Sequence, residues 1–193
     1  MSYTSGESDR MIAAMLMDCV VAAVDTTASP PVVRVRAGEW TSAWVRWHSV
    51  AAGKARHWRV PSLGEQGKLF SPSGNPAMGT FIPGLYGDAG PPPDNRDHVE
   101  VWRFDDGGSL VYDWKAKSYT IELPAGTVTV KVGGSVLTIT PNSSRLVSSK
   151  INLVGEVTID GKTQINSTLN TVGDINSAGK IIDTGGNTPN HKH

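Results

Sequence analysis

The sequence lacks several features that whole classes of protein require. Its 193 residues include one cysteine, Cys19, which excludes an internal disulfide framework and a cysteine-rich zinc site. Basic and acidic residues number 18 each, so no broad positive field is available for general binding of nucleic acids or membrane surfaces. The longest apolar stretch, residues 11–24, is short, is interrupted by Asp18 and lacks a basic lead-in, so we expect neither a transmembrane helix nor a signal peptide. These absences leave a soluble, glycine-rich protein built mainly from β-structure.

Aromatic residues are absent from the back of the chain. All six tryptophans lie before residue 115, and no aromatic residue follows Tyr119. The last 70 or so residues consist largely of Val, Ile, Leu, Thr, Ser, Asn and Gly. Large aromatic side chains normally supply much of the buried area of a globular core. We therefore expect that this part forms no compact core of its own.

The front half predicts a small β-barrel. Residues 8–18 are compatible with either a short helix or a disordered lead-in. Short alternating segments separated by proline and glycine turns predict strands at 19–24, 32–36, 44–47, 57–60, 68–71 and 80–83. About five strands in some 70 residues suit an OB-fold. Residues 87–97, which contain three consecutive prolines, predict a stiff linker.

The back half predicts further strands and an internal repeat. Alternation predicts strands at 99–104, 109–114, 120–123, 128–132 and 136–139, with a hairpin turn at 105–108. The run 154–158 recurs at 172–176, and Gly161-Lys162 recurs as Gly179-Lys180, each at an offset of 18 residues. This spacing indicates repetitive winding of β-strands.

Each of these back strands carries one thin apolar line and one polar line. A single chain would need a second sheet to bury the apolar line, and the segment has too little apolar mass for one. Three identical chains around one axis would share a core and would also pair their exposed strand edges. A trimer is the smallest cyclic assembly whose axis such small side chains can fill, so we expect a homotrimer.

The end of the chain predicts a metal site. In an extended strand His191 and His193 project to one face and Lys192 to the other. In a trimer the pair becomes six imidazoles, an octahedral set. Imidazole suits iron, nickel, copper and zinc, but zinc prefers four ligands in structural sites and matches poorly, and iron is the first choice. We therefore expect one iron ion per trimer. The alternative is a frayed tail with two solvated histidines.

No catalytic constellation is visible, so we expect no enzyme. The acidic residues on the polar faces of strands fit a solvated surface: Glu122, Glu156, Asp160 and Asp174. The histidines outside the tail fit structural or exposed roles: His48, His57 and His98. Cys19 is expected to be an unreactive buried thiol. A tryptophan and arginine platform for single-stranded nucleic acid, with Arg34, Arg36, Arg46, Arg56 and Arg59, is a weaker hypothesis for an OB-fold.

Several runs stand out in order along the chain: 44–47, 52–58, the Gly64-Glu65-Gln66 segment within 61–67, 83–86, the hairpin 103–108 and the terminal His-Lys-His. Together they resemble phage baseplate assembly protein V, the central spike of contractile tails, including those of R-type pyocins. The resemblance covers nearly the whole chain.

The resemblance implies a homotrimer with an OB-fold collar, a triple-stranded β-helix shaft and an apex that holds iron through His191 and His193. It implies that the collar docks on the tail hub and that sheath contraction drives the spike through the outer membrane of the target cell. It places the protein at the distal tip of the baseplate of a virion or bacteriocin, after synthesis in the bacterial cytoplasm. Ions such as calcium or chloride occur inside the shaft of some relatives. Relatives usually extend past the second histidine, whereas this sequence stops there, which would bring a terminal carboxylate near the metal.

These expectations divide the chain into an N-terminal segment (1–18), an OB-fold collar (19–87), a Pro-rich linker (88–98), a shaft (99–183) and a metal-binding apex (184–193). Two alternatives have other functions. A trimeric tail fibre that binds or degrades cell-surface glycan would need aromatic and carboxylate clusters along the shaft, where we expect none. A nucleic-acid-binding OB-fold protein would leave the aromatic-free part unexplained.

Overall fold

The computed structural model describes residues 3–182, and within them strands dominate. The described chain divides into two units, one within residues 1–128 with 139–143 and the other within residues 129–138 with 144–193. The parts are described one at a time below. The observed elements confirm the predicted all-β class, apart from one α-helix and two short 3-10 helices in the described part of the chain.

The helix lies earlier than predicted. Helix α1 spans Tyr3–Ala14, and strand β1 follows at Leu16–Asp25, so the sequence-based range of 8–18 was wrong at both ends and the lead-in is helical. Residues 16–18 are extended because they pair with β5 (Gln66–Phe70), with Leu16 opposite Phe70 and Asp18 opposite Lys68. Tertiary pairing therefore overrides the local helical pattern. Among the described residues, no helix has the length and apolar character needed to cross a membrane.

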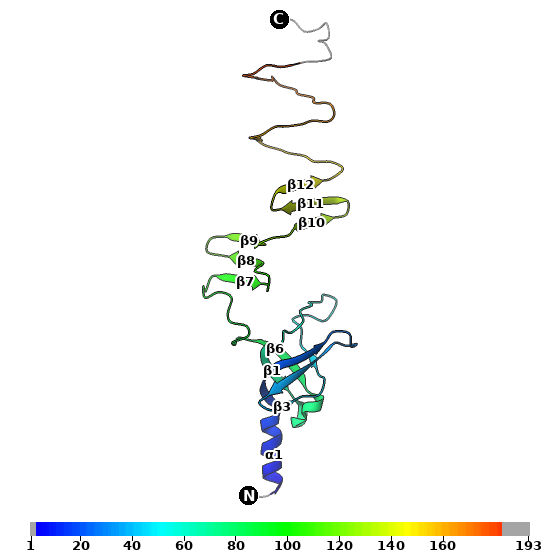
Figure 1. The fold of residues 1–193 in the computed structure, drawn as a ribbon, viewed down its shortest axis with the longest axis vertical. Helices are drawn as coiled ribbons and strands as arrows, with labels where there is room; N and C mark the ends of the chain where they lie inside the picture. The colour runs from blue at the N-terminus through cyan, green and yellow to red at the C-terminus, as the bar shows by residue number, and fades with distance from the viewer. Residues whose placement is uncertain (1–2, 183–193) are drawn as a thin grey trace. The chain divides into compact units, whose positions relative to one another are not determined.

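Residues 16–85 form a closed barrel, as the alternation predicted (Figure 1). The sheet order is β3-β2-β1-β5-β6-β4, and β4 runs parallel to β6 whereas the other pairs are antiparallel. The sheet closes between β2 and the residue that precedes β4, because Val33 and Val45 exchange backbone hydrogen bonds of 2.8 and 2.9 Å. The remaining bounds are β2 Val32–Ala37, β3 Trp40–Thr41, β4 Arg46–Trp47, η1 Pro72–Gly74, η2 Pro76–Met78 and β6 Thr80–Leu85. Closure through Val45 produces the small barrel expected of an OB-fold.

The barrel has a core of its own. On β2, Val33 and Val35 are completely buried while the intervening arginines are exposed, and Leu69 and Phe81 complete the centre. Burial raises the pKa of the Cys19 thiol to about 11, so the thiol is protonated at neutral pH, as expected of an unreactive core cysteine.

The predicted strand at 57–60 is wrong, because this segment belongs to a long loop. The His57 amide donates to the Ala51 carbonyl at 2.9 Å, and the Ser49 hydroxyl donates to the His57 carbonyl at 2.6 Å. The hydrogen-bond partners of the segment therefore lie within its own loop and not on a neighbouring strand. Trp58 packs on Trp47, with ring centroids 5.8 Å apart, and remains mostly exposed.

The predicted linker ends in a cluster of charges. Arg96 binds the Asp94 carboxylate at 2.7 Å and reaches Asp113 at 3.4 Å. The hydrogen bonds from Arg96 hold the pKa of Asp94 well below its usual range. Asp113 lies on β8, so these contacts connect the end of the linker to the strands that follow it.

Six further strands form two three-stranded sheets, of which the first is antiparallel. The first has β8 (Ser109–Asp113) between β7 (Val99–Arg103) and β9 (Ser118–Glu122). The second has β11 (Ser135–Thr140) between β10 (Val128–Val132) and β12 (Ser143–Val147). Alternation predicted all of these strands except β12, whose sequence Ser-Ser-Arg-Leu-Val does not alternate.

After β12 the described chain makes no further strand pairs. Residues 149–182 continue as extended segments separated by bends, and Figure 1 shows them winding without a neighbouring strand. Every residue from 149 to 182 is exposed. Among the described residues, this segment therefore has no strand partner and no core.

Candidate functional site

The winding segment carries a six-residue repeat. The backbone bends at 155, 161, 166–167, 172–173 and 178–179. The small residue at the start of each repeat lies at or beside these bends, in the series Ser149, Gly155, Gly161, Ser167, Gly173 and Gly179. Three such hexads make up the 18-residue offset noted above. Exact recurrence of residues predicted only the 18-residue offset, whereas the spacing of glycine and serine indicates the six-residue repeat as well.

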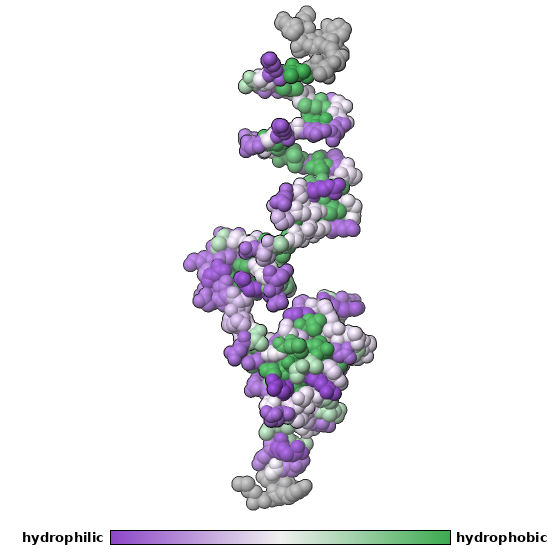
Figure 2. Space-filling model, in the orientation of Figure 1, coloured by the Kyte–Doolittle hydropathy of each residue, from purple (hydrophilic) through white to green (hydrophobic). Residues whose placement is uncertain are grey.

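Positions three and five of each hexad are mostly aliphatic. Position three is occupied by Ile151, Val157, Thr163, Leu169, Ile175 and Ile181, and position five by Leu153, Ile159, Ile165, Thr171 and Ser177. Residues two apart on a strand share a face, so these two positions form one apolar stripe. Figure 2 shows apolar residues recurring between hydrophilic ones along this segment.

The stripe has the character of an interface. Its exposed fractions include 71% for Leu153, 63% for Ile159 and 64% for Ile175. A stable soluble protein rarely exposes so continuous an apolar surface, so the stripe marks a contact with another polypeptide. The unpaired backbone on both edges of the winding calls for the same kind of partner, another β-strand.

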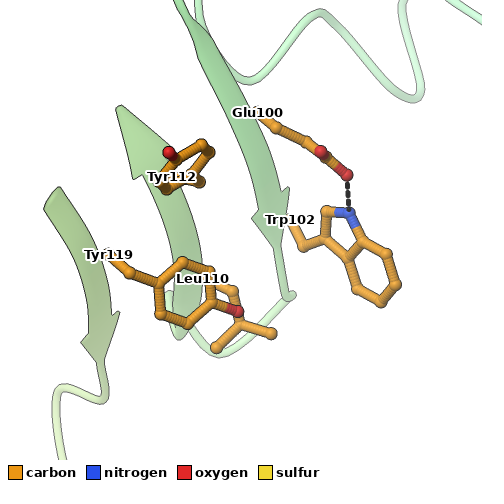
Figure 3. A pocket seen from close by; sticks show the side chains of 5 residues that line it. All are labelled: Glu100, Trp102, Leu110, Tyr112 and Tyr119. Atoms are coloured by element: carbon orange, nitrogen blue, oxygen red, sulfur yellow. Dashed lines mark hydrogen bonds between the residues drawn. The ribbon is translucent and has the colours of Figure 1, made fainter. Parts of the chain in front are cut away.

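A second exposed apolar surface lies on the β7–β9 sheet. Glu100 pairs with Tyr112, which pairs with Tyr119, and Trp102 pairs with Leu110, so all five residues share one face. They line an open hollow of about 320 Å³, shown in Figure 3. The Trp102 indole N–H donates to the Glu100 carboxylate at 3.1 Å, and Trp102 and Tyr119 remain about half exposed or more.

This face corrects one expectation. The region assigned to the shaft, 99–183, was expected to lack aromatic and carboxylate clusters, yet it carries one on β7–β9. The expectation was wrong because it extended the composition of the residues after Tyr119 to the whole shaft. The aromatic residues on this face alternate with the residues of the opposite face, where Val99, Val101 and Val111 lie, so both faces of the sheet carry apolar side chains.

The Gly64-Glu65-Gln66 segment has a structural role in the barrel. Gly64 adopts a φ of 80°, and its amide donates to Val21 on β1 at 2.9 Å. Glu65 accepts two hydrogen bonds from Arg59, at 2.6 and 2.9 Å, and one from the Ser62 amide at 2.9 Å. Burial alone would raise the pKa of Glu65, but the hydrogen bonds from Arg59 and Ser62 outweigh it and lower the pKa.

The arginines considered for a nucleic-acid platform are partly engaged elsewhere. The Arg34 guanidinium lies over the Trp44 ring, 4.9 Å from its centroid. Arg59 is committed to Glu65, and the Arg56 side chain donates to the Gly53 carbonyl at 3.3 Å. These three side chains stabilise the barrel and its loop.

The predicted metal ligands His191 and His193 lie outside the described residues. Within the part of the chain that the structure describes, no three His, Cys, Asp or Glu side chains are grouped so as to hold a metal ion. The terminal site therefore stays a prediction.

Comparison with known proteins accounts for both halves of the chain. Residues 17–86, the barrel, match the family model of the type VI secretion system/phage-baseplate injector OB domain. Residues 100–177, which contain β7–β12 and most of the hexads, match the model of the Gp138 beta helical trimerization domain. The chain is also 27% identical over 184 residues to the spike protein of Escherichia phage P2, covering 88% of this chain and 83% of that protein.

The fold and the comparisons together define a baseplate protein in which an injector OB domain precedes a β-helical trimerization domain. Over most of its length the chain is similar to a phage baseplate spike protein, as its sequence motifs indicated.

Proposed function

We propose that the protein is the trimeric central spike of a contractile tail. Its OB-fold collar docks on the tail hub, its shaft is built by three chains, and its tip pierces the outer membrane of the target cell when the sheath contracts. The observation that carries this proposal is the repeated apolar stripe of residues 149–182, which is exposed throughout and has no partner among residues 3–182. Its overlap with a trimerization domain model supports three chains as the partners.

A mechanical role fits the chemistry of such a shaft. A piercing tip must be narrow and must keep its strands together under compression. Small aliphatic residues at positions three and five allow three backbones to approach one axis closely, and mutual strand pairing removes the exposed edges. Position one is glycine or serine at the bends, and Gly155 adopts a φ of 122° that other residues rarely take.

The tip is proposed to hold one iron ion. His191 and His193 from three chains would supply six imidazole nitrogens, a donor set that suits octahedral iron. Such a metal would tie three chain ends together and couple the order of the tip to metal binding.

One analysis of the purified full-length protein tests these points together. We expect a solution mass of three times the 20.5 kDa chain and about one iron per three chains. Changing both His191 and His193 to Ala should remove the iron and leave the mass unchanged, because the apolar stripe lies upstream. A monomer would refute the spike, whereas a trimer with unchanged iron in the double variant would refute only the assignment of the metal ligands.

Deleting the coding sequence in a host that makes the particle should prevent assembly of complete baseplates, and the chain supplied separately should restore it.

A further inference from the structure

The second position of each hexad carries charges of alternating sign. The series is Lys150, Glu156, Lys162, Thr168, Asp174 and Lys180. All six side chains are exposed, and none of the five charged ones forms an ion pair within the described part of the chain. Position two is on the opposite face from positions three and five, so in a trimer these charges face solvent while the aliphatic stripe faces the axis.

The repeat dictates which hexads become neighbours in a trimer. We take the 18-residue sequence offset as one winding; it contains three bends, so each winding places one hexad on each of three faces. Rotation of a chain by one third of a turn puts its first hexad on the face that holds the second hexad of the original chain. On every face of three interleaved chains, each hexad therefore lies beside the following hexad of the neighbouring chain. Residue i of one chain then lies beside residue i+6 of the next chain.

The charge series favours this interleaved arrangement over stacking of each chain on its own previous winding. An offset of six places Glu156 between Lys150 and Lys162 of the flanking chains and pairs Asp174 with Lys180. If one chain stacked on its own previous winding, residue i would lie beside residue i+18. Glu156 would then face Asp174, and Lys162 would face Lys180. Like charges directly across neighbouring strands destabilise a sheet, whereas opposite charges stabilise it.

We infer that the outer surface of the shaft carries interchain ladders of ion pairs, Lys150–Glu156–Lys162 and Asp174–Lys180, that select the interleaved i to i+6 register over self-stacking of each chain. The inference rests on the proposed trimer and adds to it the register and a role for the charges. The aliphatic stripe cannot supply this selection, because every hexad has at least one aliphatic residue at position three or five and the stripe fits one offset as well as another.

Paired cysteines at position four test the register without removing the charges. In the full-length chain, Thr158→Cys with Gln164→Cys places thiols six residues apart, and Thr158→Cys with Asn176→Cys places them 18 apart. Neighbouring strands lie about 4.8 Å apart, which is within the Cα separation that a disulfide spans. The buried Cys19, with its raised pKa of about 11, contributes little under mild oxidation, and the single Thr158→Cys variant serves as the control.

The expected result is a covalent trimer for the 158/164 pair on a non-reducing denaturing gel. The 158/176 pair and the single variant should run as monomers, with their thiols still free. A disulfide within the 158/176 chain would overturn the inference. So would the absence of 158/164 crosslinks in a protein whose native mass is that of a trimer, and in that case the proposed spike would stand. A monomeric native mass would instead contradict the proposed function itself.

Charge reversal tests the ladder separately. Glu156→Lys places three lysines in a row, and at low salt we expect the melting temperature of the trimer to fall by at least ~2 °C. Adding Lys150→Glu and Lys162→Glu to that variant reverses the whole ladder and should restore the melting temperature. High salt should reduce the difference, because exposed charges are screened. An equal melting temperature for the single and the triple variant would show that these charges do not interact between chains.

Discussion

The stability of the proposed shaft should depend on single aliphatic residues of the stripe. Ile175 occupies position three of its hexad and is 64% exposed in one chain, while its neighbour Asn176 lies on the opposite face. Ile175→Ala and Asn176→Ala form a matched pair of variants: the first removes a side chain from the apolar stripe, and the second removes one from the opposite face. Only Ile175→Ala should weaken association.

The expected magnitude follows from the exposed area. Ile175→Ala removes three methyl or methylene groups, each worth about 0.8 kcal/mol when buried. Scaled by the 64% of the residue that assembly can still cover, the loss is about 1.5 kcal/mol per chain and about 5 kcal/mol for three chains. Since 1.4 kcal/mol corresponds to a factor of ten, the dissociation constant of the trimer should increase by roughly three to four orders of magnitude.

Sedimentation equilibrium over a range of protein concentrations measures this change. Circular dichroism can follow residues 149–182 in parallel, whereas tryptophan fluorescence does not report on them directly, because all six tryptophans precede residue 115. If Ile175→Ala and Asn176→Ala shift the association equally, or if neither does, the stripe does not face a shared axis and the reasoning fails.

The barrel offers two further predictions, both followed by tryptophan fluorescence. A Cβ at Gly67 would collide with the Ile82 carbonyl and the buried Phe81 ring, so Gly67→Ala should lower the free energy of unfolding of the barrel by about 1–3 kcal/mol, whereas Gly53→Ala, which meets open space, should change it little. Equal stabilities of these two variants would contradict the packing described. Glu65 has a lowered pKa in the folded barrel, so its contribution to the free energy of unfolding is present at neutral pH and is lost as the pH falls below about 4. Glu65→Gln should therefore reduce the loss of stability in acid. The effect should be less than about 1 kcal/mol, because Arg59 is half exposed. An unchanged acid profile in Glu65→Gln would show that the carboxylate does not stabilise the fold.

The parts of the fold that were predicted are those with strict local alternation. The run Val33-Arg34-Val35-Arg36 became β2 with its valines buried, and the run at 99–104 became β7. The errors arose where a distant segment decides the structure. Residues 16–18 read as helix but are extended by pairing with β5, and residues 57–60 read as strand but bond within their loop. Closure of the barrel through Val45 depends on a contact that no local pattern encodes.

The functional surface was predicted in kind but not in detail. Composition predicted that the residues after Tyr119 lack a core of their own, and the structure leaves residues 149–182 entirely exposed. The hexad was missed because exact recurrence at 18 residues is easier to detect than a pattern in which only residue class recurs at six. The aromatic face of β7–β9 was missed because the prediction for the shaft relied on its average composition and not on the register of its first three strands.

The two halves of the chain therefore obtain their stability from different sources. The barrel buries Val33, Leu69 and Phe81 within one chain, so its unfolding free energy does not depend on protein concentration. The proposed shaft buries its stripe only between chains, so its stability rises with concentration by mass action. Because the barrel has a core within one chain, it can fold before the three chains assemble. The charge series at position two can then act while the strands pair, because a chain that stacks on itself meets like charges at once.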